Sequence, residues 1–314
     1  MEQNKATQKL GQSKAAGHLV ALFTIVIWAT TFISTKILLV DFAPLDILFF
    51  RFVMGFAALF LFCPHQMKGI TPKQELTFAA AGLTGICLYY LLENIALTYT
   101  LASNVSVILS IAPFFIAILT FLFLKTDEKP TVTFFAGFFV AMAGIVLISL
   151  NGSALKLNPL GDLLSVVAAF VWGIYSILTR KIGEWGYPVI LTVRRTFFYG
   201  ILFMLPSLLF LDFELGLARF SNITYLLNML YLGLGASALC FVTWNIAVNV
   251  LGTITTSTYI YITPAITVLA SVLILGEPIT LFSALGTGLT IAGLFLSQYK
   301  GKRRNASQTA DSES

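Results

Sequence analysis

The sequence predicts an all-helical membrane protein, and three observations support that prediction: the composition, a series of apolar runs, and an internal repeat. Of the 314 residues, 58% are hydrophobic and only 11% are charged, whereas a soluble globular domain has about 25% charged residues. A bilayer satisfies no exposed backbone hydrogen bond, so apolar runs of about 20 residues are expected to be helices. The pattern lacks the alternating segments of about 10 residues that a membrane β-barrel requires.

The apolar runs follow a polar, basic tail at residues 1–17. The first run extends from Leu19 to Val40 without a small-residue cleavage site, which predicts an uncleaved span rather than a signal peptide. Nine further spans are predicted, which gives ten in all: 46–63, 76–98, 103–124, 131–150, 161–181, 189–211, 224–248, 254–275 and 280–298. Residues 151–160 are predicted to be an external linker, and the polar tail at 299–314 is predicted to be disordered and cytoplasmic.

The basic residues predict the orientation of the chain. With ten spans both termini lie on one side, and only Lys36, Lys156 and Arg219 fall on the other side. The side that carries the excess of Lys and Arg is cytoplasmic by the positive-inside rule, so both termini are predicted to be cytoplasmic, in a bacterial inner membrane. The residues on that side are Lys5, Lys9, Lys14, Lys68, Lys73, Lys125, Lys129, Arg180, Lys181, Lys300, Lys302, Arg303 and Arg304.

An internal repeat divides the spans into two halves of five, at 18–150 and 161–298. The residue matches keep their order along the chain, as loop insertions and deletions between true repeats would leave them. Because five is odd, the second half enters the membrane in the opposite direction, which makes the halves inverted-topology repeats. The matches are Trp28, Lys36, Pro44 and Arg51 with Trp172, Arg180, Pro188 and Arg195 (shift 144); Asn94 and Pro113 with Asn245 and Pro264 (shift 151); and Glu128, Thr131, Gly137 and Gly144 with Glu277, Thr280, Gly286 and Gly293 (shift 149).

Glu93 is the first candidate for a functional site. A carboxylate near the middle of a span costs on the order of 2.5 to 3.5 kcal/mol and should face protein or water. Glu93 shares a helix face with Tyr90 and Leu97, so it would place an acceptor beside aromatic surface, able to bind a solute ammonium or to carry a coupling proton. The alternatives are a neutral carboxyl that hydrogen-bonds between helices, or a carboxyl near the outer end that contacts water.

Asn94 and Asn245 are further candidates, although buried amides also join helices, for roughly 0.6 kcal/mol on average. Trp244 occupies the position in the second half that Glu93 occupies in the first. A cavity with a carboxylate on one wall and an indole on the other would suit an amphipathic or aromatic solute with a cationic centre.

Pro113 and Pro264 are predicted to kink their helices, because each removes a backbone donor in mid-span and leaves the carbonyls near Leu109 and Ile260 without their usual partners. The hydroxyl-rich stretches before the two prolines could bind a solute or allow close helix packing. Of Tyr259 and Tyr261, which point to different faces, at most one should reach a cavity.

Arg51 is predicted about 7 Å inside its span, where its side chain could snorkel to the outer surface. The alternative is that Arg51 attracts a solute carboxylate at the outer mouth, with Arg195 in the equivalent place at the inner mouth. Trp28 and Trp172 fit packing residues better than ligand contacts. Glu128 and Glu277 precede helix starts and are interpreted as helix caps.

The chain resembles the EamA-type members of the drug/metabolite transporter superfamily over nearly all of residues 18–298. The resemblance rests on the spans of Trp28 and Trp172, the spans of Pro113 and Pro264, and the two repeat endings, the second of which begins Leu275-Gly276-Glu277. The first ending departs from the pattern, because Lys125-Thr126-Asp127 stands where a Leu-Gly pair usually precedes the glutamate. The resemblance implies ten helices around a central cavity lined largely by the third, fourth, eighth and ninth helices.

The resemblance also implies secondary transport of small organic solutes, often efflux. We therefore expect an exporter of metabolites such as amino acids or related compounds by alternating access. Alternatives are an importer or exchanger of the same fold, or a channel or membrane receptor. The expected partners are a small-molecule solute, the lipid bilayer and, as a candidate for coupling, protons; the sequence leaves the oligomeric state open.

The sequence gives no sign of an enzyme, a cofactor or a metal site. The two histidines, His18 and His65, lie at opposite ends of separate spans, and no nucleophile or phosphate-binding motif is present. The three cysteines fall within or beside predicted spans and suggest no disulfide framework. The net charge of +5 is explained by membrane topology, so no nucleic-acid partner is expected.

Overall fold

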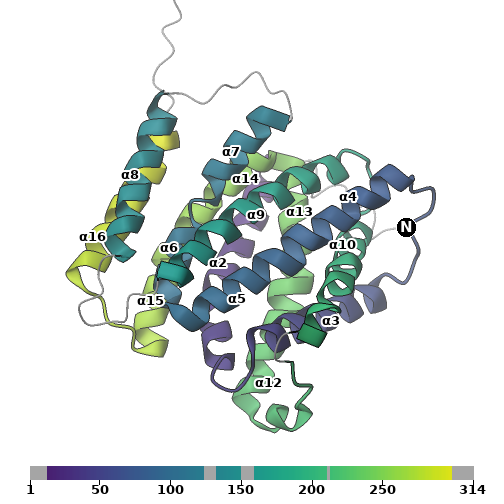
Figure 1. Ribbon diagram of the computed structural model, residues 1–314. Helices are drawn as coiled ribbons and strands as arrows, with labels where there is room; N and C mark the ends of the chain where they lie inside the picture. Colours follow the sequence, from purple (N-terminus) through teal and green to yellow (C-terminus); the bar gives the residue numbers. More distant parts are fainter. Residues whose placement is uncertain (1–12, 124–131, 150–158, 211–212, 299–314) are drawn as a thin grey trace, which may run out of the picture.

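The computed structural model describes residues 13–123, 132–149, 159–210 and 213–298, and in these ranges the chain is helical with no strand, which confirms the all-helical prediction (Figure 1). The tails, the 151–158 part of the linker, and Glu128 with its neighbouring lysines lie outside the described residues. Eight of the described helices are long and apolar enough to span a bilayer. Two shorter apolar helices, α8 (Val132–Ser149) and α16 (Leu281–Gln298), stand where the fifth and tenth spans were predicted.

The helix limits agree with the predicted limits to within five residues. Apart from α8 and α16, the first two spans of each half begin with single helices, and the third and fourth spans of each half are built from several consecutive segments. The single helices are α2 (Lys14–Leu38), α3 (Pro44–Phe62) and α9 (Pro159–Gly183), and α10 (Val189–Met204) is extended by the short α11 (Ser207–Phe210). The segmented spans, which include the third and fourth of the first half, cover Pro72–Tyr99, Ala102–Phe123, Ile223–Leu251 and Thr253–Leu275.

A π-helical segment interrupts the third span of each half at an equivalent place. In the first half, Leu83–Leu88 separates α4 (Pro72–Gly82) from α5 (Tyr89–Tyr99). In the second half, Tyr231–Leu239 separates α12 (Ile223–Leu230) from α13 (Cys240–Leu251). Each segment lies where a glycine admits a crossing helix: a Cβ on Gly82 would lie 2.6 Å from the amide nitrogen of Gly200, and one on Gly55 would lie 3.1 Å from the carbonyl oxygen of Gly233.

The fourth span of each half is broken near its proline. In the first half, α6 (Ala102–Leu109) ends before Ser110, and Pro113 is the second residue of α7 (Ala112–Phe123). In the second half, α14 (Thr253–Ser257) and a 3₁₀ turn (Thr258–Ile262) precede α15 (Thr263–Ala270), whose second residue is Pro264, and a π-helical segment (Ser271–Leu275) follows. One expectation is corrected: the carbonyl of Ile260 is not left without a partner, because the 3₁₀ geometry lets it accept a hydrogen bond from the Thr263 amide.

The helices α8 and α16 pack side by side at one edge of the molecule (Figure 1). Their contact is made by repeat-related glycines. A Cβ on Gly137 would lie 2.4 Å from the Gly293 carbonyl oxygen, and one on Gly144 would lie 2.6 Å from the Gly286 carbonyl oxygen. The two backbones therefore approach as closely as small residues at a membrane helix interface permit.

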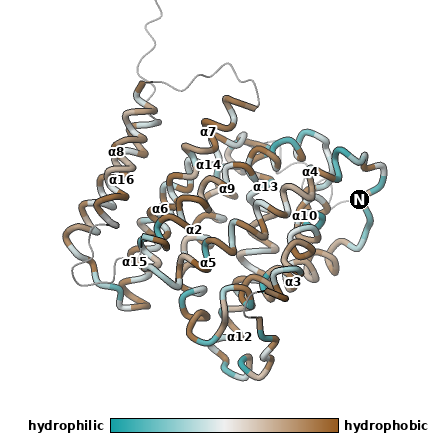
Figure 2. Tube along the Cα trace, in the orientation of Figure 1, coloured by the Kyte–Doolittle hydropathy of each residue, from teal (hydrophilic) through white to brown (hydrophobic). Residues whose placement is uncertain are grey.

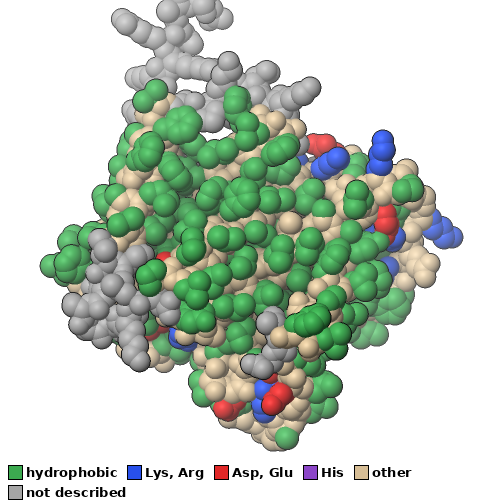
Figure 3. Space-filling view, viewed as in Figure 1, with side chains coloured by type: hydrophobic (Ala, Val, Ile, Leu, Met, Phe, Trp, Pro, Cys, Tyr) green, Lys and Arg blue, Asp and Glu red, His purple; other side chains and the backbone are tan. Residues whose placement is uncertain are grey.

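Apolar residues cover the middle of the helices, and polar residues gather at the ends of the bundle (Figure 2). On the face seen in Figure 3, hydrophobic side chains form a broad continuous surface, while Lys and Arg side chains gather beside α4 and the start of the chain. Such a surface suits contact with lipid tails.

Candidate functional site

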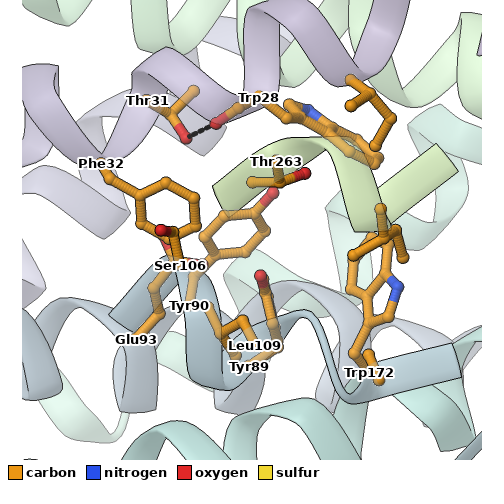
Figure 4. Close-up of a pocket in the computed structure, with 13 residues that line it drawn as sticks. Trp28, Thr31, Phe32, Tyr89, Tyr90, Glu93, Ser106, Leu109, Trp172 and Thr263 are labelled. Atoms are coloured by element: carbon orange, nitrogen blue, oxygen red, sulfur yellow. Dashed lines mark hydrogen bonds between the residues drawn. The ribbon is translucent and has the colours of Figure 1, made fainter. Parts of the chain in front are cut away.

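A small cavity of about 50 Å³ lies inside the bundle, between segments of both halves (Figure 4). It is lined from the first span (α2), the third (α5), the fourth (α6 and the start of α7), the sixth (α9) and the ninth (3₁₀ turn and α15). No described residue of the eighth span lines it, which corrects the set of walls that the resemblance implied. The lining residues are Ile25, Trp28, Thr31, Phe32, Tyr89, Tyr90, Glu93, Ser106, Leu109, Ala112, Trp172, Ile260 and Thr263.

Two tryptophans that are equivalent in the two halves form an aromatic wall of the cavity. Trp28 and Trp172 contact each other edge-to-face, with ring centroids 5.5 Å apart, and Tyr89 lies 4.8 Å from Trp172. The indole nitrogen of Trp28 donates to the Ala236 carbonyl at 2.9 Å, which fixes the ring across the bundle. The sequence favoured both tryptophans as packing residues, and their position in the cavity is a finding of the structure.

Trp244 does not line the cavity, contrary to the expectation that it would form the opposite wall. Its ring is 2% exposed and packs behind Trp28, with centroids 5.0 Å apart. The Trp244 side chain points toward the aromatic core rather than the cavity, so the indoles that line the cavity are those of Trp28 and Trp172.

Glu93 is buried and lines the cavity from α5 (Figure 4). The residue is only 1% exposed, so the interpretation that it contacts water at the outer end is wrong. Its Oε1 atom has no hydrogen-bond partner among the described residues. A buried polar atom without a partner is costly, on the order of 1 to 3 kcal/mol, so this oxygen is available to a ligand or a proton.

Arg51 is also fully buried, and the expectation that it snorkels to the surface is wrong. The close approach at Gly55 and Gly233 places the π-helical segment Tyr231–Leu239 over this part of α3, and Arg51 Nε donates to Ser237 Oγ at 3.1 Å. The guanidinium lies 4.3 Å from the centroid of the Tyr90 ring, and neither Nη1 nor Nη2 has a partner among the described residues. Arg51 therefore stands behind Tyr90 rather than in the cavity, within electrostatic range of Glu93.

The repeat-related asparagines lie outside the cavity lining. Asn94 Nδ2 donates to the Pro44 carbonyl at 3.0 Å and so joins α5 to α3, while Asn245 Nδ2 donates to Phe241 within its own helix. These bonds are those of packing residues. Asn94 Oδ1 has no partner among the described residues.

Of the other polar candidates, Ser106 and Thr263 line the cavity, and neither Tyr259 nor Tyr261 does. The Tyr259 hydroxyl instead hydrogen-bonds His18 Nδ1 at 2.7 Å. Arg195 binds Glu75 through Nη2 at 2.6 Å and Nε at 3.0 Å. Tyr259 and Arg195 therefore have their partners away from the cavity.

Glu277 caps a helix, but not the helix that follows it. Its carboxylate accepts from the Ala102 amide at 2.8 Å, the Ser103 amide at 3.2 Å and the Ser103 hydroxyl at 2.7 Å, at the start of α6. Sequence neighbourhood predicted the cap on α16, whereas the fold brings the loop after Leu275 to another helix. Lys36 lies close by and donates to the carbonyls of Leu97 and Thr100 at the end of α5.

A second, more open hollow of about 540 Å³ lies beside these two charged residues and is lined by Lys36, Ile37, Val40, Leu101, Tyr225, Leu275, Gly276, Glu277 and Pro278. By contrast, the central cavity of about 50 Å³ has room for water but not for a metabolite, since ligand sites are typically about 300 to 1,000 Å³. A solute can enter the central cavity only if its walls separate.

Comparisons with known proteins match this architecture. The model of the EamA-like transporter family matches residues 15–150 and again 159–299. An uncharacterized transporter of Archaeoglobus fulgidus is 28% identical over 90% of this chain and 97% of its own. A probable terminal-alkyne amino-acid exporter of Streptantibioticus cattleyicolor is 27% identical over 94% of this chain and 97% of its own. A solved crystal structure aligns with a TM-score of 0.63 and 18% identity over 91% of this chain and 97% of that chain, which shows a shared fold.

Proposed function

We propose, from the premise that the chain belongs to the EamA-like transporter family, that it is a secondary transporter that exports small organic metabolites such as amino acids or related compounds by alternating access. The observation that carries this proposal is the buried carboxylate of Glu93, whose Oε1 atom has no hydrogen-bond partner among the described residues and which lines a cavity walled by aromatic rings. Family membership supports transport itself and a small-molecule solute in a membrane.

The chemistry of the cavity favours a solute with an amino group. A carboxylate oxygen beside Trp28, Tyr89 and Trp172 can attract an ammonium through charge and through the faces of the rings. Arg51 stands one side chain away, behind Tyr90, with two nitrogens to offer a carboxylate once the cavity widens. An amino acid carries both groups, and a relative is named an amino-acid exporter. A coupling proton on Glu93 is the alternative use of the same oxygen.

Alternating access is supported by the contacts between repeat-related positions. Trp28 contacts its own equivalent, Trp172, and the glycines of α8 and α16 pair crosswise, Gly137 with Gly293 and Gly144 with Gly286. Self-complementary pairing of this kind is what a two-fold axis generates. An axis between halves of opposite orientation lies in the membrane plane, so we propose two inverted repeats, with α8 and α16 as the fifth and tenth spans.

Counterflow in proteoliposomes tests the proposal. Vesicles loaded with an unlabelled amino acid should accumulate the radiolabelled form transiently, with a panel of amino acids as probes. Glu93→Gln should lower the rate of exchange by about tenfold, or about 1.4 kcal/mol of interaction free energy. Glu214→Gln, an exposed carboxylate, is the control that should keep the rate. If a Glu93→Gln variant exchanges at the normal rate across pH, Glu93 has no part in transport.

The same assay separates the other functions. A channel dissipates the gradient without exchange, and a receptor moves no label, so neither gives counterflow. An importer or exchanger of the same fold would give counterflow but would not protect cells from a toxic amino acid, whereas an exporter would. Absence of exchange for every amino acid and amine tested would overturn the assignment of the solute class.

A further inference from the structure

The outer ends of the cavity walls are held together by two charged side chains. Under the proposed orientation, Lys36 and Glu277 lie at the outer end of the bundle, between the central cavity and the hollow of about 540 Å³. Phe32 of α2 lines the cavity, and Lys36, one helical turn further along, lines the hollow. The line from the cavity to the outer hollow therefore passes these two residues.

Both side chains bind the connection between α5 and α6, Lys36 at the end of α5 and Glu277 at the start of α6. Lys36 Nζ donates to the carbonyls of Leu97 and, at 2.8 Å, Thr100, at the negative end of the α5 dipole. Glu277 accepts from Ala102 and Ser103 at the positive end of the α6 dipole. Because Lys36 belongs to α2 and Glu277 follows the span of α15, these bonds join four of the segments that line the cavity.

The other end of the bundle has a cationic residue equivalent to Lys36, but its ion pair is within its own helix. The repeat places Arg180 opposite Lys36, and the connection of α13 to α14 around Gly252 opposite that of α5 to α6. Arg180 lies near this connection, since a Cβ on Gly252 would be 3.9 Å from its Nη1 atom. Arg180 nevertheless forms an ion pair with Glu184, one turn further along the same helix, with 3.6 Å between Nε and Oε1. The Arg180 side chain is 36% exposed. The hydroxyl oxygen of Thr253, at the start of α14, is buried without a partner among the described residues.

We propose that Lys36 and Glu277 form a charged latch that keeps the outer end of the pathway closed, and that Arg180 forms the corresponding contact with the α13–α14 connection when the outer latch is released. This proposal rests on the proposed transport function. Opening to the outside breaks the bonds of Lys36 and Glu277 to the α5–α6 connection, and the helix termini that they satisfied become hydrated. The Arg180 contact then closes the inner end, so that the two ends are not open together.

Cysteine labelling tests the latch without any knowledge of the solute. In full-length protein with Cys63, Cys87 and Cys240 replaced by Ser, a single cysteine in the cavity (Thr263→Cys) is exposed to a membrane-impermeant maleimide added outside intact cells. Glu277→Gln and Lys36→Met should each speed this labelling by about tenfold, the effect of losing one charge-assisted hydrogen bond. Lys36→Arg, which keeps a cationic donor, and Glu214→Gln, an exposed carboxylate in the connection before α12, should leave the rate unchanged.

Loss of the contact proposed for Arg180 should affect labelling from the other side of the membrane. Arg180→Gln should not speed labelling from outside, but should speed labelling of Thr263→Cys in inside-out vesicles. If Lys36→Met fails to fold, Glu277→Gln carries the test, because glutamine keeps an oxygen for the Ala102 amide. Unchanged labelling in a folded Glu277→Gln variant overturns the latch. Labelling needs no solute, so the two proposals can fail separately. Expected labelling without counterflow would refute the proposed function and support the latch. Normal counterflow with unchanged labelling would support the proposed function and refute the latch.

Discussion

Two buried carboxylates show how differently the same group is used. Asp46, 1% exposed, accepts from Arg219 Nη1 at 2.9 Å, from the Ala43 amide at 3.2 Å and from the Glu214 amide at 3.0 Å. Glu93 is buried to the same degree, yet its Oε1 atom has no partner among the described residues. The first carboxylate holds the connection 213–221 against α3, whereas the second keeps one oxygen for a ligand or a proton.

Replacement of Asp46 should therefore destabilise the protein. Asp46→Asn leaves Arg219, 18% exposed, without its counter-ion, and removing one partner of a buried pair costs about 3 to 5 kcal/mol. Thermal unfolding in detergent should show a clearly lower midpoint for Asp46→Asn, with Glu214→Gln as the exposed control. An unchanged midpoint would mean that the ion pair contributes nothing.

Glu93→Gln should act in the opposite sense. The variant removes a buried charge whose Oε1 atom has no hydrogen-bond partner among the described residues, so the same measurement should show an equal or higher midpoint although transport falls. Loss of stability together with loss of transport would instead identify Glu93 as a structural carboxyl.

At the scale of the elements, the limits of the spans could be predicted because they follow directly from composition. The interruptions could not. The π-helical segments at Leu83–Leu88 and Tyr231–Leu239 keep the apolar pattern of their neighbours, and they arise where a helix from elsewhere in the chain crosses at a glycine. The cap by Glu277 on α6 and the burial of Arg51 were missed for the same reason, since both depend on contacts between distant segments.

The glycines of α16 allow a matched comparison. A Cβ on Gly293 would lie 2.4 Å from the backbone nitrogen of Ala141, whereas one on Gly288 meets open space. Gly288→Ala should stabilise the helix by up to about 1 kcal/mol, whereas Gly293→Ala should cost about 1 to 3 kcal/mol through overpacking against α8. Thermal unfolding in detergent measures both. Equal effects at the two positions would show that α8 and α16 do not depend on this close contact.

At the scale of the whole molecule, the repeat could be predicted from the order of its matches, and so could three walls of the cavity, the spans of Glu93, Ser106 and Thr263. The walls formed by α2 and α9 were not predicted, because Trp28 and Trp172 have the sequence pattern of packing residues. Their shared role follows from the approach of the two halves, and periodicity within one helix does not report that approach. The proposed inversion of the second half requires α8 to cross the bilayer, since only an odd number of spans inverts the second half.

Topology reporters can test this crossing at the connection between α9 and α10. The helix α8 has 18 residues and a length of about 27 Å, close to the hydrocarbon thickness of about 30 Å, so slight thinning of the bilayer suffices for it to span. Gly186 lies in an open turn with φ of 72°. A reporter fused after this residue should lie in the cytoplasm, where a fluorescent protein is active and alkaline phosphatase is inactive.

A fusion after Gly216 should report the outside in the same experiment, and a C-terminal fusion should report the cytoplasm. The C-terminal fusion alone decides little, because both termini remain on the same side whether α8 and α16 both span or both lie on the surface. The Gly186 fusion distinguishes these arrangements, since a surface-lying α8 moves Arg180, Lys181 and the reporter to the outside, against the positive-inside rule. Phosphatase activity at Gly186 would thus refute the inverted repeat, and with it the pairing of Arg180 with Lys36 as opposite ends of one pathway.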